Sequence, residues 1–67
     1  MSVASVSTIT ASSKESWQDA LRQGLERARR TLRGITSVEV LTERARVREG
    51  AILAYEVELK IIFELDN

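Results

Sequence analysis

Residues 51–65, AILAYEVELKIIFEL, alternate apolar and polar side chains over almost their whole length. The apolar set would share one face of an extended strand: Leu53, Tyr55, Val57, Leu59, Ile61, Phe63 and Leu65. The other face would carry Ala54, Glu56, Glu58, Lys60 and Glu64. Because successive side chains of a strand point to opposite faces, this pattern predicts one long strand buried on a single face. That face requires a cover from the rest of the chain.

The preceding residues predict the antiparallel partner of this strand. Residues 38–47 are rich in β-branched side chains, but their apolar positions change phase along the segment. A bulge between Val40 and Glu43 would reconcile the two phases. Arg48, Glu49 and Gly50 form the only turn signal before the last strand, so we expect a tight hairpin with Gly50 at a positive φ.

Residues 14–33 predict an amphipathic helix. Apolar or small side chains recur there at intervals of three and four: Trp17, Ala20, Leu21, Gly24, Leu25, Ala28 and Leu32. Ser12 or Ser13 is expected to cap the start, and Ser12 with Glu15 has the spacing of a capping box. Gly34 is a suitable left-handed stop. The helix stripe can cover the apolar face of the two strands.

Residues 3–10 are rich in Val, Thr and Ile and read as a further strand. The chain is therefore predicted to have the order β-α-β-β and the α+β class, in one domain spanning residues 1–67. A chain of 67 residues buries only about 60% of its unfolded surface. With no cysteine to form disulfides, we expect self-association to complete its core.

The composition also excludes several classes of function. Without cysteine or histidine the chain has no thiolate nucleophile, imidazole base or structural zinc site, so we expect it not to be an enzyme. Oxygen-ligated cations remain possible. The formal net charge is zero, which suggests neither nucleic acid nor a membrane surface as partner. The start of the chain lacks the pattern of a secretion signal, which favours a cytoplasmic location.

The helix also carries a run of basic residues that suggests RNA contact at first sight: Arg22, Arg27, Arg29, Arg30 and Arg33. Asp19 and Glu26 are interleaved with them, and no aromatic residue lies among them. We therefore interpret these arginines as a solvated helix face.

The ordered set of segments resembles the dodecin family over nearly the whole chain. The segments are Ser-Ser-Lys-Glu-Ser-Trp at 12–17, Thr-Leu-Arg-Gly-Ile at 31–35, Glu-Gly at 49–50 and Tyr-Glu-Val-Glu-Leu-Lys-Ile-Ile-Phe at 55–63. The resemblance implies a three-stranded antiparallel sheet wrapped around one helix, twelve copies of which close into a hollow shell. It also implies a protein that binds and stores a small ligand between subunits, without turnover.

Flavin-binding dodecins stack isoalloxazine rings between Trp side chains of neighbouring subunits, and a Gln of the last strand bonds the ring edge. The resemblance places Ser37 at the Trp position, before Val38, and Glu56 at the Gln position. A missing aromatic pair removes about 0.5–1.5 kcal/mol of stacking beyond area burial. An ionised carboxylate also accepts hydrogen bonds but cannot donate one. We therefore expect FMN or riboflavin to bind more weakly than in flavin dodecins.

The Arg44/Arg46 pair and Trp17 each allow two interpretations. Arg44 and Arg46 resemble a basic pair that meets ligand phosphates in many dodecins, and the alternative is a solvated or interface ion pair. Trp17 lies on the apolar helix stripe, which favours core packing over a role in ligand binding.

Glutamates on the last strand are candidate metal ligands. Glu56 and Glu58 share the face turned away from the helix, and symmetry copies could converge to hold calcium or magnesium through oxygens. Some dodecins without the stacking Trp resemble this chain and are associated with calcium. The alternative is that these glutamates form salt bridges with arginines of neighbouring subunits.

Overall fold

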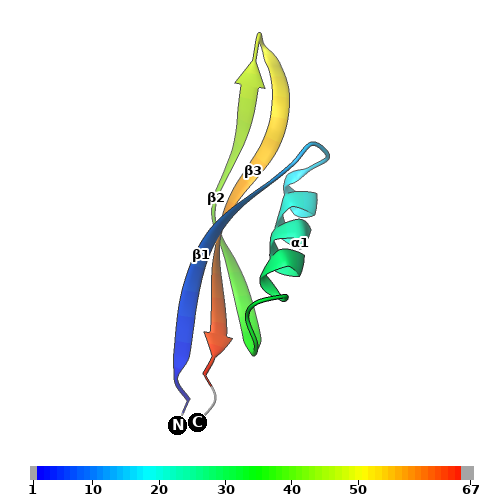
Figure 1. Ribbon diagram of the computed structural model, residues 1–67. Coiled ribbons are helices and arrows are strands. Elements are labelled where there is room, and N and C mark those ends of the chain that lie inside the picture. The colour runs from blue at the N-terminus through cyan, green and yellow to red at the C-terminus, as the bar shows by residue number, and fades with distance from the viewer. Residues whose placement is uncertain (1, 66–67) are drawn as a thin grey trace.

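The computed structural model describes residues 2–65, which form one three-stranded sheet and one helix (Figure 1). The elements are β1 (Ala4–Ser13), α1 (Trp17–Ala28), β2 (Ile35–Arg48) and β3 (Ala51–Glu64). Both outer strands pair antiparallel with β3, in the order β1-β3-β2. The predicted α+β class and β-α-β-β order are confirmed.

The central strand β3 supplies most of the core. Val57, Leu59 and Ile61 are 0–1% exposed and point to the side covered by α1, as the alternation predicts. The helix lies mainly over β1 and β3 and buries its small residues Ala20 and Ala28 there. Small side chains on this helix face let its backbone approach the sheet closely.

The helix begins at Trp17 and ends at Ala28, within the predicted range of 14–33 but shorter. Its N-cap is Ser16, whose hydroxyl accepts from the Asp19 N–H at 2.9 Å. The prediction of Ser12 or Ser13 as cap was wrong, because β1 continues through Ser13, which pairs with Tyr55. A turn follows the helix, and Gly34 leads into β2 with a φ of 73°, the left-handed conformation expected there.

Buried Ser13 joins the end of β1 to the first turn of α1. Its hydroxyl accepts from the Glu15 N–H at 2.9 Å and donates to the Asp19 carboxylate at 2.6 Å. Gln23 and Arg22 also donate to that carboxylate. These contacts, of which the Ser13 hydrogen bond is the largest contribution, hold the pKa of Asp19 below its ordinary value.

The β2–β3 hairpin closes through a two-residue turn. Glu49 and Gly50 have φ values of 52° and 79°, so both positions are left-handed, as in a type I′ turn. The register shifts between Val40 and Thr42, where the bulge was predicted. Two further shifts, at Ile35/Ser37 and Arg46/Val47, were not foreseen.

A single copy is long and thin. Its radius of gyration is 13.8 Å, against about 11 Å for a compact chain of this length. Its accessible surface is 5040 Å², roughly 800 Å² more than a compact monomer of this mass presents. The β2–β3 hairpin extends well beyond the end of the helix (Figure 1). Within residues 2–65, no helix has the length and the apolar character that crossing a membrane requires.

Candidate functional site

The predicted ligand residues lie mostly on the sheet face opposite α1, which we call the open face. Residues of β1, β3 and β2 stand side by side there in rows: Ser12–Glu56–Arg44, Thr10–Glu58–Thr42, Thr8–Lys60–Glu39 and Val6–Ile62–Ser37. The face is thus polar at three rows and partly apolar at the fourth. Every glutamate proposed to hold a ligand lies in its central strand.

Glu56 forms an ion pair with Arg44 across the two strands. The Arg44 Nε donates to Glu56 Oε1 at 2.6 Å, and the side chains are 45% and 19% exposed. This ion pair lies within one chain, whereas the salt-bridge alternative expected an arginine from a neighbouring subunit. The other carboxylate oxygen accepts no further hydrogen bond within residues 2–65, and the Arg44 terminal nitrogens donate none there. The pair can offer a donor and an acceptor to one ligand edge.

Ser37 and Glu56 are far apart within a single chain. Ser37 pairs with Ile62, whereas Glu56 lies six residues away along β3. At about 3.3 Å per residue, the two rows are about 20 Å apart. A small ligand cannot touch both in one copy, so any site that uses both needs residues from two copies.

Val38 lies on the opposite side of the sheet from Ser37. It is half-buried against the core cluster, so its side chain already has a packing role. Because β2 is an edge strand, its backbone is the part left to meet a ligand.

Arg46 lies in a different setting from Arg44. It is exposed and pairs with Ala54, and it lines an open depression together with Lys14 and Ser12. Neither Arg46 nor Lys14 takes part in a salt bridge in the described part of the chain. Of the two predicted arginines, Arg46 is therefore the one free to meet an anionic group.

The described part of one chain does not bring together enough ligands for a metal site. No cluster of three or more acidic, histidine or cysteine side chains suited to a metal occurs among residues 2–65. Glu56 and Glu58 project from the same face of β3 two residues apart, and a calcium ion takes 6–8 oxygen ligands. The carboxylates would have to be completed by other copies.

Trp17 joins the helix to the row that contains the ion pair. Its indole N–H donates to the Arg44 carbonyl oxygen at 3.0 Å, and its ring meets Tyr55 edge-to-face at 4.9 Å. These contacts agree with the interpretation of Trp17 as a packing residue. The link to Arg44 spans 27 residues of sequence and was not predicted, because nothing in the helix pattern indicates which strand the indole N–H meets.

Residues 3–66 match the model of the Dodecin family. The chain belongs to the dodecin family. A dodecin from Streptomyces davaonensis is 32% identical, with a TM-score of 0.92 and coverage of 98% of this chain and 97% of that one. A Thermus thermophilus protein is 30% identical, with a TM-score of 0.93 and coverage of 100% and 98%. No curated protein matches the chain.

A third similar structure is a dodecin that is described together with its ligand. It is the calcium-chelating antigen of Mycobacterium tuberculosis, calcium dodecin, described with a calcium-binding site. It is 28% identical, has a TM-score of 0.83, and the match covers 96% of this chain and 91% of that one. The dodecin fold therefore does not by itself identify a ligand, and the ligand must be argued from individual residues.

Proposed function

We propose that this dodecin is the subunit of a hollow homododecamer that binds or stores a small planar ligand, FMN or riboflavin or another nucleotide, at sites between subunits. The protein has no catalytic role in this proposal. The main support for sites between subunits is the separation of about 20 Å between the rows of Ser37 and Glu56, because one copy offers only half of such a site. The long, thin shape of the single chain supports the same conclusion.

The open face favours weak flavin binding. Ser37 gives no aromatic surface on which a ring can stack, and Glu56 is already paired with Arg44. In compensation, Arg44 supplies the donors that a carboxylate lacks, so the pair can replace the donor and acceptor of one amide. Arg46 and Lys14 can meet a phosphate, which favours FMN over riboflavin.

Quenching of flavin fluorescence tests this function. We expect weak quenching by the native protein and tighter binding by the variant Ser37→Trp, Glu56→Gln. Two stacking rings add about 1–3 kcal/mol, or roughly 5- to 150-fold in affinity. Thr8→Trp adds an exposed ring elsewhere on the open face and is the control. Equal quenching by the double variant and this control would remove Ser37 and Glu56 from the site.

Assembly is tested separately by native mass spectrometry. We expect a twelve-subunit particle, and any retained small molecule adds its mass to the same spectrum. A monomer that persists at high protein concentration would contradict the whole proposal.

The surroundings of Glu58 favour a second candidate function, a shell that holds calcium or magnesium. This side chain lies between Thr10 and Thr42 on the open face and forms no salt bridge within residues 2–65. The similarity to a calcium-chelating dodecin supports the same candidate. Calorimetric titration with calcium should give heat that Glu58→Gln abolishes and Glu64→Gln, a change at the exposed end of β3, preserves. No heat from the native protein would reject it.

A further inference from the structure

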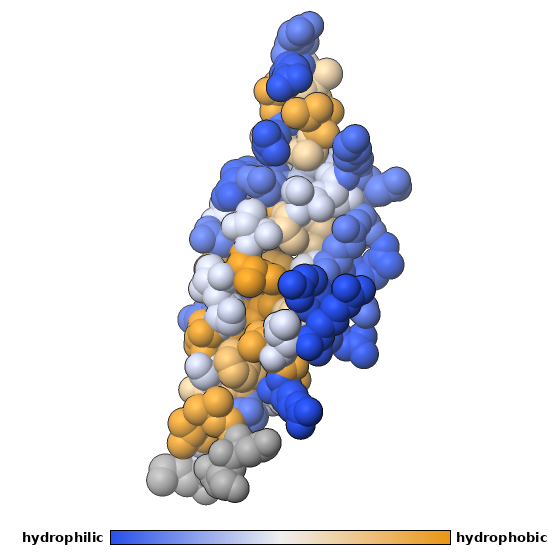
Figure 2. Space-filling view, in the orientation of Figure 1, coloured by the Kyte–Doolittle hydropathy of each residue, from blue (hydrophilic) through white to orange (hydrophobic). Residues whose placement is uncertain are grey.

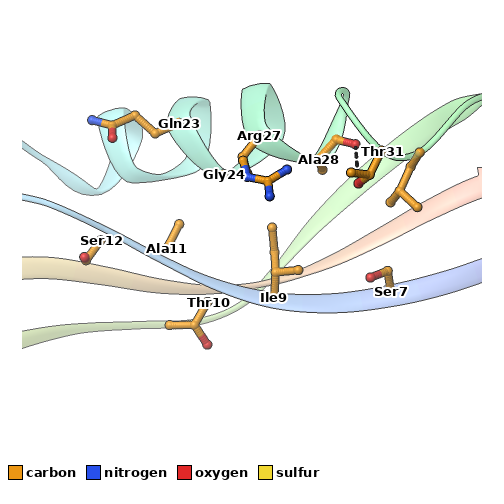
Figure 3. Close-up of a pocket in the computed structure, with 11 residues that line it drawn as sticks. Ser7, Ile9, Thr10, Ala11, Ser12, Gln23, Gly24, Arg27, Ala28 and Thr31 are labelled. Carbon is orange, nitrogen blue, oxygen red and sulfur yellow. Dashed lines mark hydrogen bonds between the residues drawn. The ribbon is translucent and has the colours of Figure 1, made fainter.

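An open groove of about 540 Å³ runs between α1 and β1. Figure 3 shows Ile9 and Ala11 pointing from β1 toward the helix, and Arg27 on the side of the helix that faces Ile9. Ala28 and Leu32 complete the apolar part of the lining. In the space-filling view, hydrophobic surface accordingly shows between the charged helix and the sheet (Figure 2).

The groove lies at an incomplete edge of the molecule. β1 is an outer strand, so only one of its sides is paired, with β3. Its ten pairs run from Ala4 to Ser13 without a register shift, whereas the other outer strand, β2, has three. A regular edge strand beside an apolar groove is a surface that natural proteins usually cover.

The same chain carries a projecting apolar segment. We call residues 46–54 the arm, because they lie beyond the pair Ala45–Tyr55, at which the Trp17 ring packs on the sheet. Val47 and Ile52 are cross-strand partners with side chains on one face, and they are 62% and 54% exposed. Hydrophobic surface is visible at this tip in Figure 2.

We infer that the arm of one copy docks in the α1–β1 groove of a neighbouring copy. The arm cannot enter its own groove, because β3 runs continuously from Val57, the partner of the groove residue Ala11, to the arm at Ile52, about 17 Å away at strand spacing. The contact is therefore between two different surfaces. Repeated around an axis, such a contact closes into a ring, as a shell requires. The inference rests on the proposed assembly.

The exposed area and the net charge of the chain both agree with a second copy as the occupant of the groove. The single chain exposes roughly 800 Å² more than a compact monomer, and a standard interface covers about 800 Å² per partner. The chain has no net charge, so identical copies meet no long-range repulsion. Arg27 at the groove and Glu49 at the arm turn are in no salt bridge within residues 2–65, and docking gives each an opposite charge.

Cysteine cross-linking tests the contact in the assembled protein. The chain contains no cysteine, so introduced thiols are unique. Ile52→Cys on the arm is co-expressed with Thr31→Cys in the groove, and only one variant carries an affinity tag. A short bismaleimide should join the two variants several-fold more than it joins Ile52→Cys to Thr8→Cys on the open face. Equal yields would overturn the inference.

A second variant measures the contribution of the arm to assembly. Val47→Asp places a charge on the docking face, and Val3→Asp is its control at a similarly exposed valine, 48% accessible, outside both surfaces. We expect Val47→Asp to shift the particle to smaller species in native mass spectra, and Val3→Asp to leave it intact.

The outcomes separate this inference from the proposed function. An intact particle from Val47→Asp without arm–groove cross-links overturns the docking and leaves the ligand proposal standing. Cross-links in a particle that binds no flavin or nucleotide support the docking and overturn the ligand proposal. A native protein that stays monomeric overturns both.

Discussion

Replacing Gly24 with alanine should destabilise the protein even though alanine is the better helix former. A Cβ on Gly24 would lie 2.8 Å from Leu59 Cδ1 and 3.1 Å from Ala11 Cβ. Leu59 is fully buried at the centre of the core, so its methyl group has little space to move. The Ala11 Cβ is fixed to the backbone of β1. The helix would have to move outward or Leu59 would have to leave its rotamer.

Two opposing terms set the size of the effect. Overpacking a core by one methyl group costs about 1–3 kcal/mol. Alanine in place of glycine inside a helix returns about 1 kcal/mol. We expect a net loss of about 1 kcal/mol in the free energy of unfolding, which lowers Tm by about 4–8 °C in a domain of this size.

Thermal unfolding followed by circular dichroism measures this difference. Native protein and variant are compared at equal protomer concentration, because assembly makes Tm depend on concentration. Gln18→Ala, at an exposed position of the same helix, is the control and should change Tm little. A Gly24→Ala variant more stable than the native protein would show that the helix and sheet are not in the close contact described.

Two further changes test the contacts around the helix start. Trp17→Phe keeps a ring against Tyr55 but removes the donor to Arg44, so we expect a loss of about 1 kcal/mol in urea unfolding; an unchanged midpoint would mean that this hydrogen bond adds nothing. The lowered pKa of Asp19 stabilises the fold above the unfolded pKa of about 4, and this contribution is lost as the pH falls through the lower folded value. Ser13→Ala brings the folded pKa back toward its ordinary value and should move acid unfolding to higher pH. An Asp19→Asn background should abolish that shift, and a shift that persists there would assign the effect to another group.

The fold was predictable because the alternating side chains of β3 indicate which of its faces is buried. Alternation over 51–65 allows only one buried face, and Val57, Leu59 and Ile61 occupy it. The hairpin was predictable for a similar local reason, since glycine at residue 50 suits the positive φ of the turn. Local chemistry also predicted the bulge after Val40.

The helix start was less predictable because three serines compete for it. Ser12, Ser13 and Ser16 can all cap a helix, and only the length of the pairing between β1 and β3 excludes the first two. Propensity alone does not contain that tertiary information. Hence the observed helix begins three residues later than predicted.

The site depends on tertiary pairing that no local pattern contains. Arg44 and Arg46 were predicted to act as one basic pair, yet the structure places them in different surroundings. Arg44 is opposite Glu56 and bonded to it, whereas Arg46 is opposite Ala54 and lies beside Lys14. The register of β2 against β3 decides this difference, and the shift between Arg46 and Val47, next to the hairpin turn, sets that register.

The Arg44–Glu56 pair also explains why the glutamate cannot be treated as a simple substitute for an amide. A free carboxylate beside a ring carbonyl would repel it, but a carboxylate that shares its charge with a guanidinium presents both polarities to the ligand. Removal of either partner would leave a charge without its neighbour. Arg44 is held in turn by the Trp17 indole at its carbonyl oxygen, so the helix that covers one sheet face also positions the polar pair on the other.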